Sequence, residues 1–300
     1  MNLDPSEEEA YLDKAVATLF ARHGPSERLL DELAGSGYLD VVREAGPMAG
    51  VIVVERAADA QVIGPIGARV LTGPLVGHYD LPPAVGIIDA MTGSLCRWGP
   101  QCEAFFVLDG DAGRIASRDD VEMEPVESSF GATYGRVHVR RAEAICDGAG
   151  LRRAWQVTIA VEAEATMLAA IAKTVDHVAG RRQFGRPIGA FQAVQHRLAS
   201  TYAMAMGTRW LARRAAWFHD DEFLTASAAA YACEAAQITY TNMHQVSGAV
   251  GITSEYGLVG WTTRLLGLRQ ELGGQRAHAR RVTITRRGMP KPWPSPLPLP

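Results

Sequence analysis

The sequence predicts a mainly α-helical protein with a small β region in its middle. Three observations lead to this fold class. Short amphipathic patterns run from about residue 5 to 90, alternating apolar patterns from about 94 to 145, and long helical patterns from about 148. With 300 residues, 47% of them hydrophobic and 21% charged, the chain is long enough for a sizeable core and two or three domains.

The N-terminal region, residues 1–92, is expected to form a domain of short helices. Its first helix opens with Ser6 followed by Glu9, which is the spacing of a capping box, and Gly24 is expected to end it. The later run "GSG" at 35–37 is interpreted as a helix end. Neither a strand nor a full glycine fingerprint precedes it, so it does not indicate a phosphate loop.

Residues 93–146 are expected to form a small β domain. The run "EAFFVLDGDAGRIASR" places two short apolar stretches around a glycine-containing turn, which is typical of a hairpin. The run "ATYGRVHVRRAEAI" alternates, with Val137 and Val139 on one side and His138 and Arg140 on the other.

Residues 147–288 are expected to form a four-helix bundle. One helix should end at Gly180, a second should run from near Phe191 towards Asp220, and the runs "TASAAAYACEAAQ" and "YGLVGWTTRLLGL" open two more. Four long helices joined by short loops favour an antiparallel bundle. The remaining segment, 289–300, is proline-rich and is expected to be an extended tail.

Composition excludes several classes of partner and location. A net charge of -3 gives no electrostatic argument for nucleic acid or an anionic membrane, and the basic run 276–287 is interpreted as a solvated helix end. The cysteines lack metal-ligand spacing and are interpreted as reduced thiols: Cys96, Cys102, Cys146 and Cys233. Without a signal peptide or an apolar membrane span, a cytoplasmic location is expected.

Two glycine-containing runs carry the binding chemistry. In "RRQFGRPIGAFQ", Gly185 and Pro187 enforce a turn between the first two bundle helices. Arg181 can fork onto a phosphate there, and Phe184 can cover an aromatic ring. The alternative is that the arginines are merely solvated and Phe184 packs in the core.

The second run, "HQVSGAVGITSEYGL", follows the third bundle helix. Gly248 and Gly251 allow backbone amides to approach a ligand, and Gln245 can donate a hydrogen bond to it. Such an arrangement suits an anion. Helices rather than strands surround the run, so it is not a dinucleotide fingerprint.

Together, and in this order, the two runs resemble the acyl-CoA dehydrogenase family. "RRQFGRPIGAFQAVQHRLA" is similar to that family's Arg-x-x-Phe-Gly loop and the helix after it. "HQVSGAVGITSEY" is similar to its Gln-x-x-Gly-Gly-x-Gly turn, with Ala249 at the second glycine. The resemblance is specific over about 150–285. It implies an N-terminal helical domain, a β-barrel-like middle domain and a C-terminal four-helix bundle.

The resemblance also implies a cofactor, FAD, and an acyl-CoA substrate. In the family, the two motifs reach across a dimer interface to the diphosphate and adenine end of the flavin. Carried over to this sequence, that role falls on Arg181, Phe184, Gln245 and Gly248.

The family's reaction, α,β-desaturation of an acyl-CoA thioester, needs a carboxylate base at the α-carbon. Its two known base positions align with Leu272 or Gly273 on the last long helix, and with Trp155 on the first. None of these is a carboxylate.

Three glutamates near these positions could in principle supply the carboxylate. Glu271 is one residue off, about 100° of rotation on a helix, and is the weak candidate for the base; glycines after it could loosen the helix and turn it inward. Glu162 and Glu164 lie too far along the first helix to substitute simply. The alternative for all three is an ordinary residue on a helix surface.

The middle region also lacks the family's Thr-Glu-Pro to Gly-Ser-Asp run and its Trp-Ile-Thr strand. The chain therefore looks like the shortened, base-lacking subunit of heteromeric acyl-CoA dehydrogenases of the steroid-CoA type. The leading hypothesis is a non-catalytic partner that donates FAD contacts to a larger subunit carrying the glutamate, in lipid or steroid catabolism. The alternatives are a homo-oligomeric dehydrogenase using Glu271 and a flavin-free helical scaffold.

Overall fold

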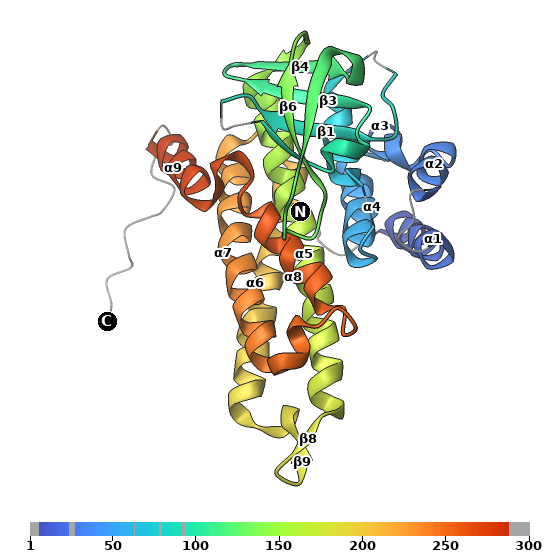
Figure 1. Ribbon diagram of the computed structural model, residues 1–300. Coiled ribbons are helices and arrows are strands. Elements are labelled where there is room, and N and C mark those ends of the chain that lie inside the picture. Colours follow the sequence, from blue (N-terminus) through green and yellow to red (C-terminus); the bar gives the residue numbers. More distant parts are fainter. Residues whose placement is uncertain (1–5, 24–27, 63, 78–79, 92–93, 288–300) are drawn as a thin grey trace.

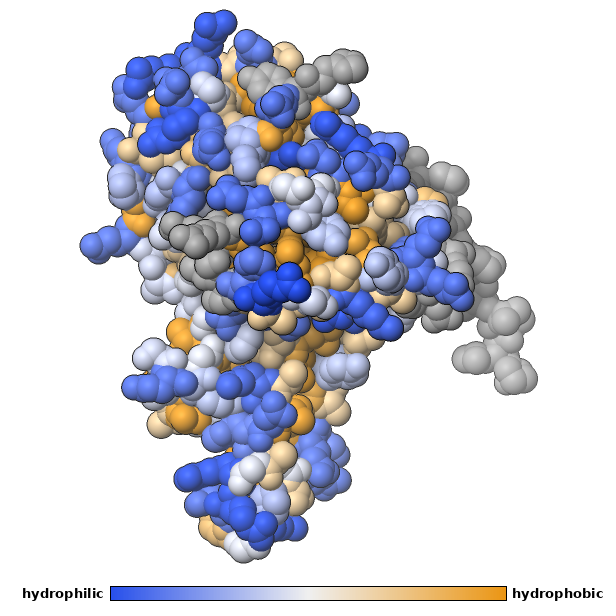
Figure 2. All heavy atoms as spheres, turned by 90° about the vertical axis from the view of Figure 1, so that its right-hand side faces the viewer, coloured by the Kyte–Doolittle hydropathy of each residue, from blue (hydrophilic) through white to orange (hydrophobic). Residues whose placement is uncertain are grey.

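The computed structural model describes residues 6–23, 28–62, 64–77, 80–91 and 94–287. A β region lies at one end of a long helical bundle, and the N-terminal helices lie beside the bundle (Figure 1). Away from the β region the bundle narrows to a stem, whose surface carries hydrophilic and hydrophobic residues side by side (Figure 2). The helix end expected at Gly24 and the tail expected at 289–300 lie outside the described residues.

The N-terminal region consists of short helices, as predicted: α1 (Glu7–His23), α2 (Arg28–Gly35), α3 (Val41–Ala45) and α4 (Pro47–Asp59). The capping box is confirmed. The amide of Glu9 donates to the Ser6 hydroxyl at 3.1 Å, and the Ser6 amide donates to the Glu9 carboxylate at 2.9 Å. The "GSG" run begins at Gly35, the last residue of α2, in accord with its interpretation as a helix end.

The β region is made of two sheets. One has the order β1 (Val85–Asp89), β3 (Ala104–Asp109), β4 (Ala112–Ser117) and β7 (Glu143–Asp147), and the other β2 (Leu95–Arg97), β6 (Tyr134–Val139) and β5 (Val121–Val126). Alternation along β3 divides its side chains. Phe105 packs into the core between the sheets, whereas Phe106 and Leu108 pack towards α5 (Gly148–Gly180). β1 and β3 of the first sheet are therefore buried on both faces.

The first strand corrects the boundary that the sequence suggested at Gly93. β1 begins at Val85 and pairs in parallel with β3, and Val85 to Ile88 are all buried. A strand buried on both faces shows no alternation, so periodicity cannot distinguish it from a helical segment. The predicted β3–β4 hairpin is confirmed, with Gly110 in its turn at φ 58°.

The bundle contains α5, α6 (Gln192–Trp217), α7 (Glu222–Ser247) and α8 (Leu258–Leu268). The fourth helix, α8, is short, whereas four long helices were expected. A short turn, Glu271–Gly273, separates α8 from α9 (Gly274–Arg287), which packs against α7 near the β region (Figure 1). Leu272, Gly273 and Gly274 all have positive φ angles, and a right-handed helix cannot continue through them.

The structure also bears on the expectations about membrane spans and cysteines. No helix within the described residues is long and apolar enough to cross a membrane. The four cysteines are all free thiols, as predicted.

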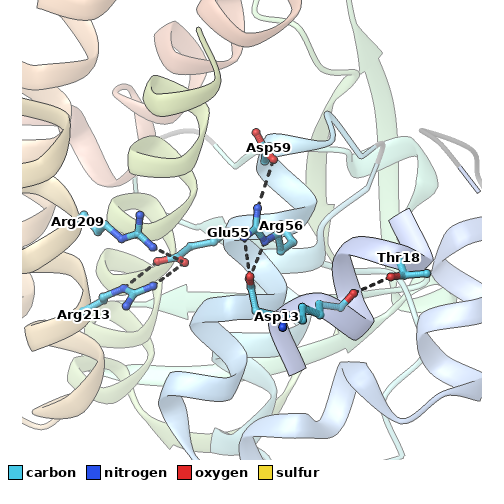
Figure 3. Close-up of polar contacts among 8 residues, drawn as sticks. Asp13, Thr18, Glu55, Arg56, Asp59, Arg209 and Arg213 are labelled. Carbon is cyan, nitrogen blue, oxygen red and sulfur yellow. Dashed lines mark hydrogen bonds and ion pairs between the residues drawn. The ribbon is translucent and has the colours of Figure 1, made fainter. Parts of the chain in front are cut away.

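Ion pairs join the N-terminal helices to the bundle. The carboxylate of Glu55, on α4, accepts hydrogen bonds from Nε and Nη2 of Arg213 at 3.1 and 2.9 Å, and Arg209 lies 3.6 Å away (Figure 3). The adjacent Arg56 forks onto Asp13 of α1 at 2.6 and 2.7 Å. Such bidentate contacts fix the relative orientation of α1, α4 and α6.

Glu164, on α5, lies beside this cluster and is only 1% exposed, so its interpretation as a helix-surface residue is wrong. Its Oε2 atom has no hydrogen-bond partner within the described chain. Burial raises the pKa of this carboxyl well above its usual value, and the neighbouring charge of Glu55 raises it further. The raised pKa favours the protonated, neutral form of Glu164.

We expect Glu164→Gln to remove a pH-dependent loss of stability. The folded protein keeps this proton to a higher pH than the unfolded chain, whose carboxyl titrates near its ordinary pKa of 4.5. The contribution of Glu164 to stability is therefore fully present below that pH and is lost as pH rises. The amide of glutamine keeps a hydrogen-bond donor but does not titrate. The free energy of unfolding of the variant should therefore rise by about 1–3 kcal/mol at about pH 8 and change little at about pH 4. Urea unfolding at both pH values measures this gain, and an equal effect at both would contradict the assignment.

Candidate functional site

A pocket of about 280 Å³ lies between the β region and the C-terminal helices. We call it the Arg97 pocket; its lining includes Arg97, Trp98, Phe130, Tyr134, Trp155, Glu271, Leu272 and Gly273. It brings together both positions at which the resemblance places a catalytic base, the one at Trp155 and the one at Leu272 or Gly273. These come from opposite ends of the C-terminal half and meet because α8 ends beside the first turns of α5.

Glu271 points into this pocket because the helix is broken after α8. Its Oε1 accepts a hydrogen bond from Nε of Arg97 at 2.8 Å, and its Oε2 accepts one from the indole of Trp155 at 2.5 Å. The interpretation of Glu271 as a helix-surface residue is therefore wrong. Each carboxylate oxygen thus already accepts one hydrogen bond, and the two bonds hold the carboxylate towards Arg97 and Trp155.

Arg97 holds a second carboxylate as well. Its Nη1 lies 2.8 Å from Oε2 of Glu162, and the two side chains are 10% and 9% exposed. Burial opposes the charge of Arg97, but Glu162 and Glu271 outweigh it and raise the pKa of the guanidinium. Glu162 is thus another buried partner rather than a residue on the helix surface.

Arg264, on α8, completes the charge balance of this region. Burial lowers its pKa to about 10, and it still bears its charge at neutral pH. One of its Nη atoms donates to the carbonyl of Val62 at 3.0 Å, and its guanidinium lies 5.5 Å from the ring centre of Trp98. Two arginines thus face two carboxylates, Glu162 and Glu271, which is the arrangement that buried charges require.

The hydroxyl of Tyr134 is a buried polar group in the lining of the pocket. It has no hydrogen-bond partner in the described chain, and burial raises its pKa. Gly267 provides the space for it, because a Cβ atom there would collide with this hydroxyl. Gly67 does the same for the carboxylate of Glu162. Two glycines therefore admit polar side chains into a closely packed region.

Sequence reasoning missed Arg97, Tyr134 and the pairing of Glu162. A signal for the last was present: "AVEAEATM" sets two glutamates in an apolar stretch, where a helix has no wet face, and a buried charge needs a partner. Arg97 has no local signal, since both of its partners lie far away in the sequence.

The arginine loop forms a tight hairpin at the far end of the bundle. Its strands are β8 (Arg182–Gln183) and β9 (Arg186–Pro187), and the turn between them holds Phe184 and Gly185 at φ 52° and 79°. Two successive residues with positive φ are typical of a two-residue hairpin loop. Phe184 is 91% exposed, so the alternative of a core position is wrong.

Only one of the loop's arginines is left without a partner. Arg182 donates to the carbonyl of Gly185 at 2.9 Å, and Arg186 lies 4.2 Å from the ring centre of Phe191. Arg181 is exposed and makes no side-chain hydrogen bond or ion pair within the described residues. Its guanidinium is therefore available to a ligand or another subunit.

The second glycine-containing run ends α7 near the same end of the bundle (Figure 1). Gln245 and Gly248 are both exposed. The hydroxyl of Tyr256, which follows the turn, donates to the carbonyl of Lys173 at 2.8 Å and holds the run against α5. All four residues that sequence reasoning assigned to a cofactor are thus exposed towards one end of the bundle.

We expect Gly248→Ala to destabilise the protein by about 1–3 kcal/mol, because its backbone lies at φ 64° and ψ -150°, a region that side chains strongly disfavour. A Cβ atom there would meet no other atom within 4 Å, so the cost is conformational rather than steric. Thermal unfolding measures it. The neighbouring Ala249→Gly is the control, and a Gly248→Ala variant as stable as the parent would contradict the reported backbone.

The two functional regions lie far apart. From Trp155 to Arg181, α5 advances by about 39 Å at 1.5 Å per residue. Residues of the β region line the Arg97 pocket, whereas β8 and β9 of the arginine loop lie at the other end of the bundle (Figure 1).

Comparison with known proteins places these features in context. Residues 155–287 match the family described as acyl-CoA dehydrogenase, C-terminal domain. The acyl-CoA dehydrogenase IpdE2 of Mycobacterium tuberculosis is 26% identical over 317 aligned positions, which cover 93% of this chain and 98% of the relative.

Solved structures share the fold. The ChsE4-ChsE5 complex from Mycobacterium tuberculosis matches with a TM-score of 0.81 and 19% identity, covering 97% of this chain and 100% of that chain. A variant of the Tcur3481-Tcur3483 steroid ACAD matches with a TM-score of 0.81 and 18% identity, over 94% and 98% of the two chains. The fold class and the resemblance expected from the sequence are thereby confirmed.

Proposed function

Since this chain is a relative of the acyl-CoA dehydrogenases along nearly its whole length, we propose that it is the base-lacking subunit of a heteromeric, FAD-dependent member of that family. The observation that carries this proposal is the state of Glu271. It is the carboxylate nearest to the family's base position, and Arg97 and Trp155 occupy both of its oxygens. A larger partner subunit would then supply the base.

The residues of this chain suit one end of FAD and not the whole molecule. At about 280 Å³, the Arg97 pocket lies just below the usual range for ligand sites, about 300–1,000 Å³, and a buried ion-pair network forms one of its walls. The exposed loops suit the anionic end: Arg181 offers a forked donor, and the space beside Gly248 is open.

The separation of the two regions favours a site shared between subunits. Because Arg181 lies about 39 Å along α5 from Trp155, its loop would contact an FAD whose flavin ring is held elsewhere. Arg181 would bind the diphosphate of that FAD, and Phe184 would cover an aromatic face. When bound, FAD would accept hydride from the β-carbon of the acyl-CoA.

The names of similar proteins suggest the class of substrate. One matched structure is described as a steroid ACAD, and another is a complex of two differently named proteins, ChsE4 and ChsE5. We therefore propose a bulky CoA ester of the steroid type as substrate, in lipid or steroid catabolism.

Co-purification tests the proposal. The chain should be purified alone, and with a larger homologue of the same organism that carries the glutamate, and visible spectra should be recorded before and after anaerobic addition of acyl-CoA. We expect the chain alone to bind no stoichiometric FAD, and the complex to bind FAD that bleaches with substrate. Stoichiometric FAD on the chain alone, bleached by acyl-CoA, would reject the subunit assignment.

Glu271→Gln separates this proposal from a self-sufficient dehydrogenase. Glutamine keeps a carbonyl oxygen that can accept from one of the two donors, Arg97 or Trp155, but cannot take a proton. We therefore expect turnover of the assembled enzyme to stay within about threefold of the parent, since loss of a general base costs about 10²–10⁴-fold. Steady-state kinetics with acyl-CoA decide the matter, and a loss in that larger range would make Glu271 the base.

A flavin-free scaffold remains the alternative from another class. The absence of the Gly-Ser-Asp and Trp-Ile-Thr segments favours this alternative. The exposed Arg181 and Gly248 favour a site for an anionic ligand instead. A complex that stays colourless with every partner, and whose melting temperature does not respond to FAD, would favour the scaffold.

A further inference from the structure

A second cavity lies on a different face of α5 from the Arg97 pocket, between the N-terminal region, the first turns of α5 and the end of α6. Its volume is about 310 Å³. Trp155 faces the first pocket, whereas Ala154 and Val157 line the second. We call it the Arg153 pocket; its other lining residues are Val42, Pro47, Leu71, Pro74, Leu75, Gly150, Arg153, Ala216, His219 and Asp220.

Most of this lining is apolar. Arg153 contributes a cationic side chain to it, and that side chain is largely buried. The Nε atom of Arg153 is buried without a hydrogen-bond partner in the described chain. Its ion pair with Asp220 is 3.6 Å long, and the two side chains are 19% and 84% exposed. A contact of that length with a solvated carboxylate does not satisfy the guanidinium, and a buried donor without a partner is costly. The fork of Arg153 is thus available beside an apolar wall.

We propose that the Arg153 pocket binds a monocarboxylic acid with an unbranched apolar body of about eight carbons. The volume corresponds to roughly ten water-sized groups, and octanoate has about that many heavy atoms. The apolar lining buries the chain, and a planar carboxylate matches the fork of Arg153. Asp220 at the same place disfavours a second negative charge, so a carboxylate suits the site better than a phosphate. This site is independent of the function proposed above.

Calorimetric titration of octanoate into the full chain, with any co-purifying partner, tests the proposal, and octan-1-ol is the neutral probe. We expect saturable binding of octanoate, and binding of octan-1-ol at least tenfold weaker. Arg153→Gln should weaken octanoate at least tenfold and leave octan-1-ol unchanged. Ala154→Leu, which fills the cavity, should weaken both.

Arg140→Gln is the matched control, because it removes an arginine that is 61% exposed in the β region. It should bind octanoate as the parent does. Three results would each overturn the proposal: no saturable binding of octanoate, equal binding of octan-1-ol, or an Arg153→Gln variant with the parent's affinity. Circular dichroism of each variant distinguishes lost binding from lost folding.

Discussion

Replacing Arg97 by leucine should destabilise the protein by about 3–5 kcal/mol, which is the usual cost of removing one partner from a buried ion pair. The substitution leaves the carboxylates of Glu162 and Glu271 without their shared guanidinium, and these side chains are only 9% and 12% exposed. Leucine offers neither a charge nor a donor in return. Chemical denaturation at neutral pH measures the loss, and the midpoint should fall without a change in slope.

Two further variants separate charge from packing. Adding Glu162→Gln and Glu271→Gln to Arg97→Leu removes the unpaired charges, so the triple variant should recover most of the lost stability. Arg140→Leu, which breaks an exposed pair, should cost about 1 kcal/mol or less. If Arg97→Leu costs as little as Arg140→Leu, the ion-pair network does not stabilise the fold.

Local patterns predicted the helical parts of the fold well. The capping box at Ser6, the end of α5 at Gly180 and the hairpin of β3 and β4 all depend on residues close together in the sequence, and all are present. β1 was missed because its burial on both faces comes from its neighbours and leaves no periodic signal. The glycines after Glu271 indicated a loosened helix, and the structure shows a complete break there.

The same distinction between local and long-range features applies to the candidate site. The loops at Arg181 and Gly248 could be found because each is a short contiguous motif whose turn chemistry is visible in the sequence. The ion-pair network could not be found, since Arg97, Glu162 and Glu271 come from a strand, a helix and a turn that only tertiary packing brings together. A glutamate set among apolar residues signals a buried partner but does not identify it.

This division supports separate roles for the two ends of α5. At the β end, charges that a catalytic site would need free are paired with one another, which favours stability over proton transfer. At the other end, an exposed aromatic ring and an exposed guanidinium without a partner in the described chain suit a surface that another molecule covers. Both observations are consistent with the proposal that this chain shares a cofactor with a partner subunit.

Arg181→Ala should therefore weaken FAD binding by the assembled complex about tenfold to a hundredfold while the fold stays intact. A charge-assisted hydrogen bond from a guanidinium to a phosphate contributes about 1.5–3 kcal/mol, which corresponds to that change in Kd. Arg181 is exposed and has no partner within the described chain, so its loss removes no internal contact. Fluorescence titration of the apo complex with FAD measures the change, and the melting temperature without FAD should not move.

Arg182→Ala is the closest control, because it removes the same charge one residue further along the loop. Arg182 already donates to the carbonyl of Gly185 at 2.9 Å, so it has less to offer a diphosphate, and its loss should change FAD affinity by less than about threefold. Full FAD affinity in Arg181→Ala together with weak binding in Arg182→Ala would mean that the neighbouring arginine makes the contact. Full affinity in both variants would exclude this loop from the flavin site, because no other side chain of the hairpin combines a free guanidinium with this exposure among the residues described.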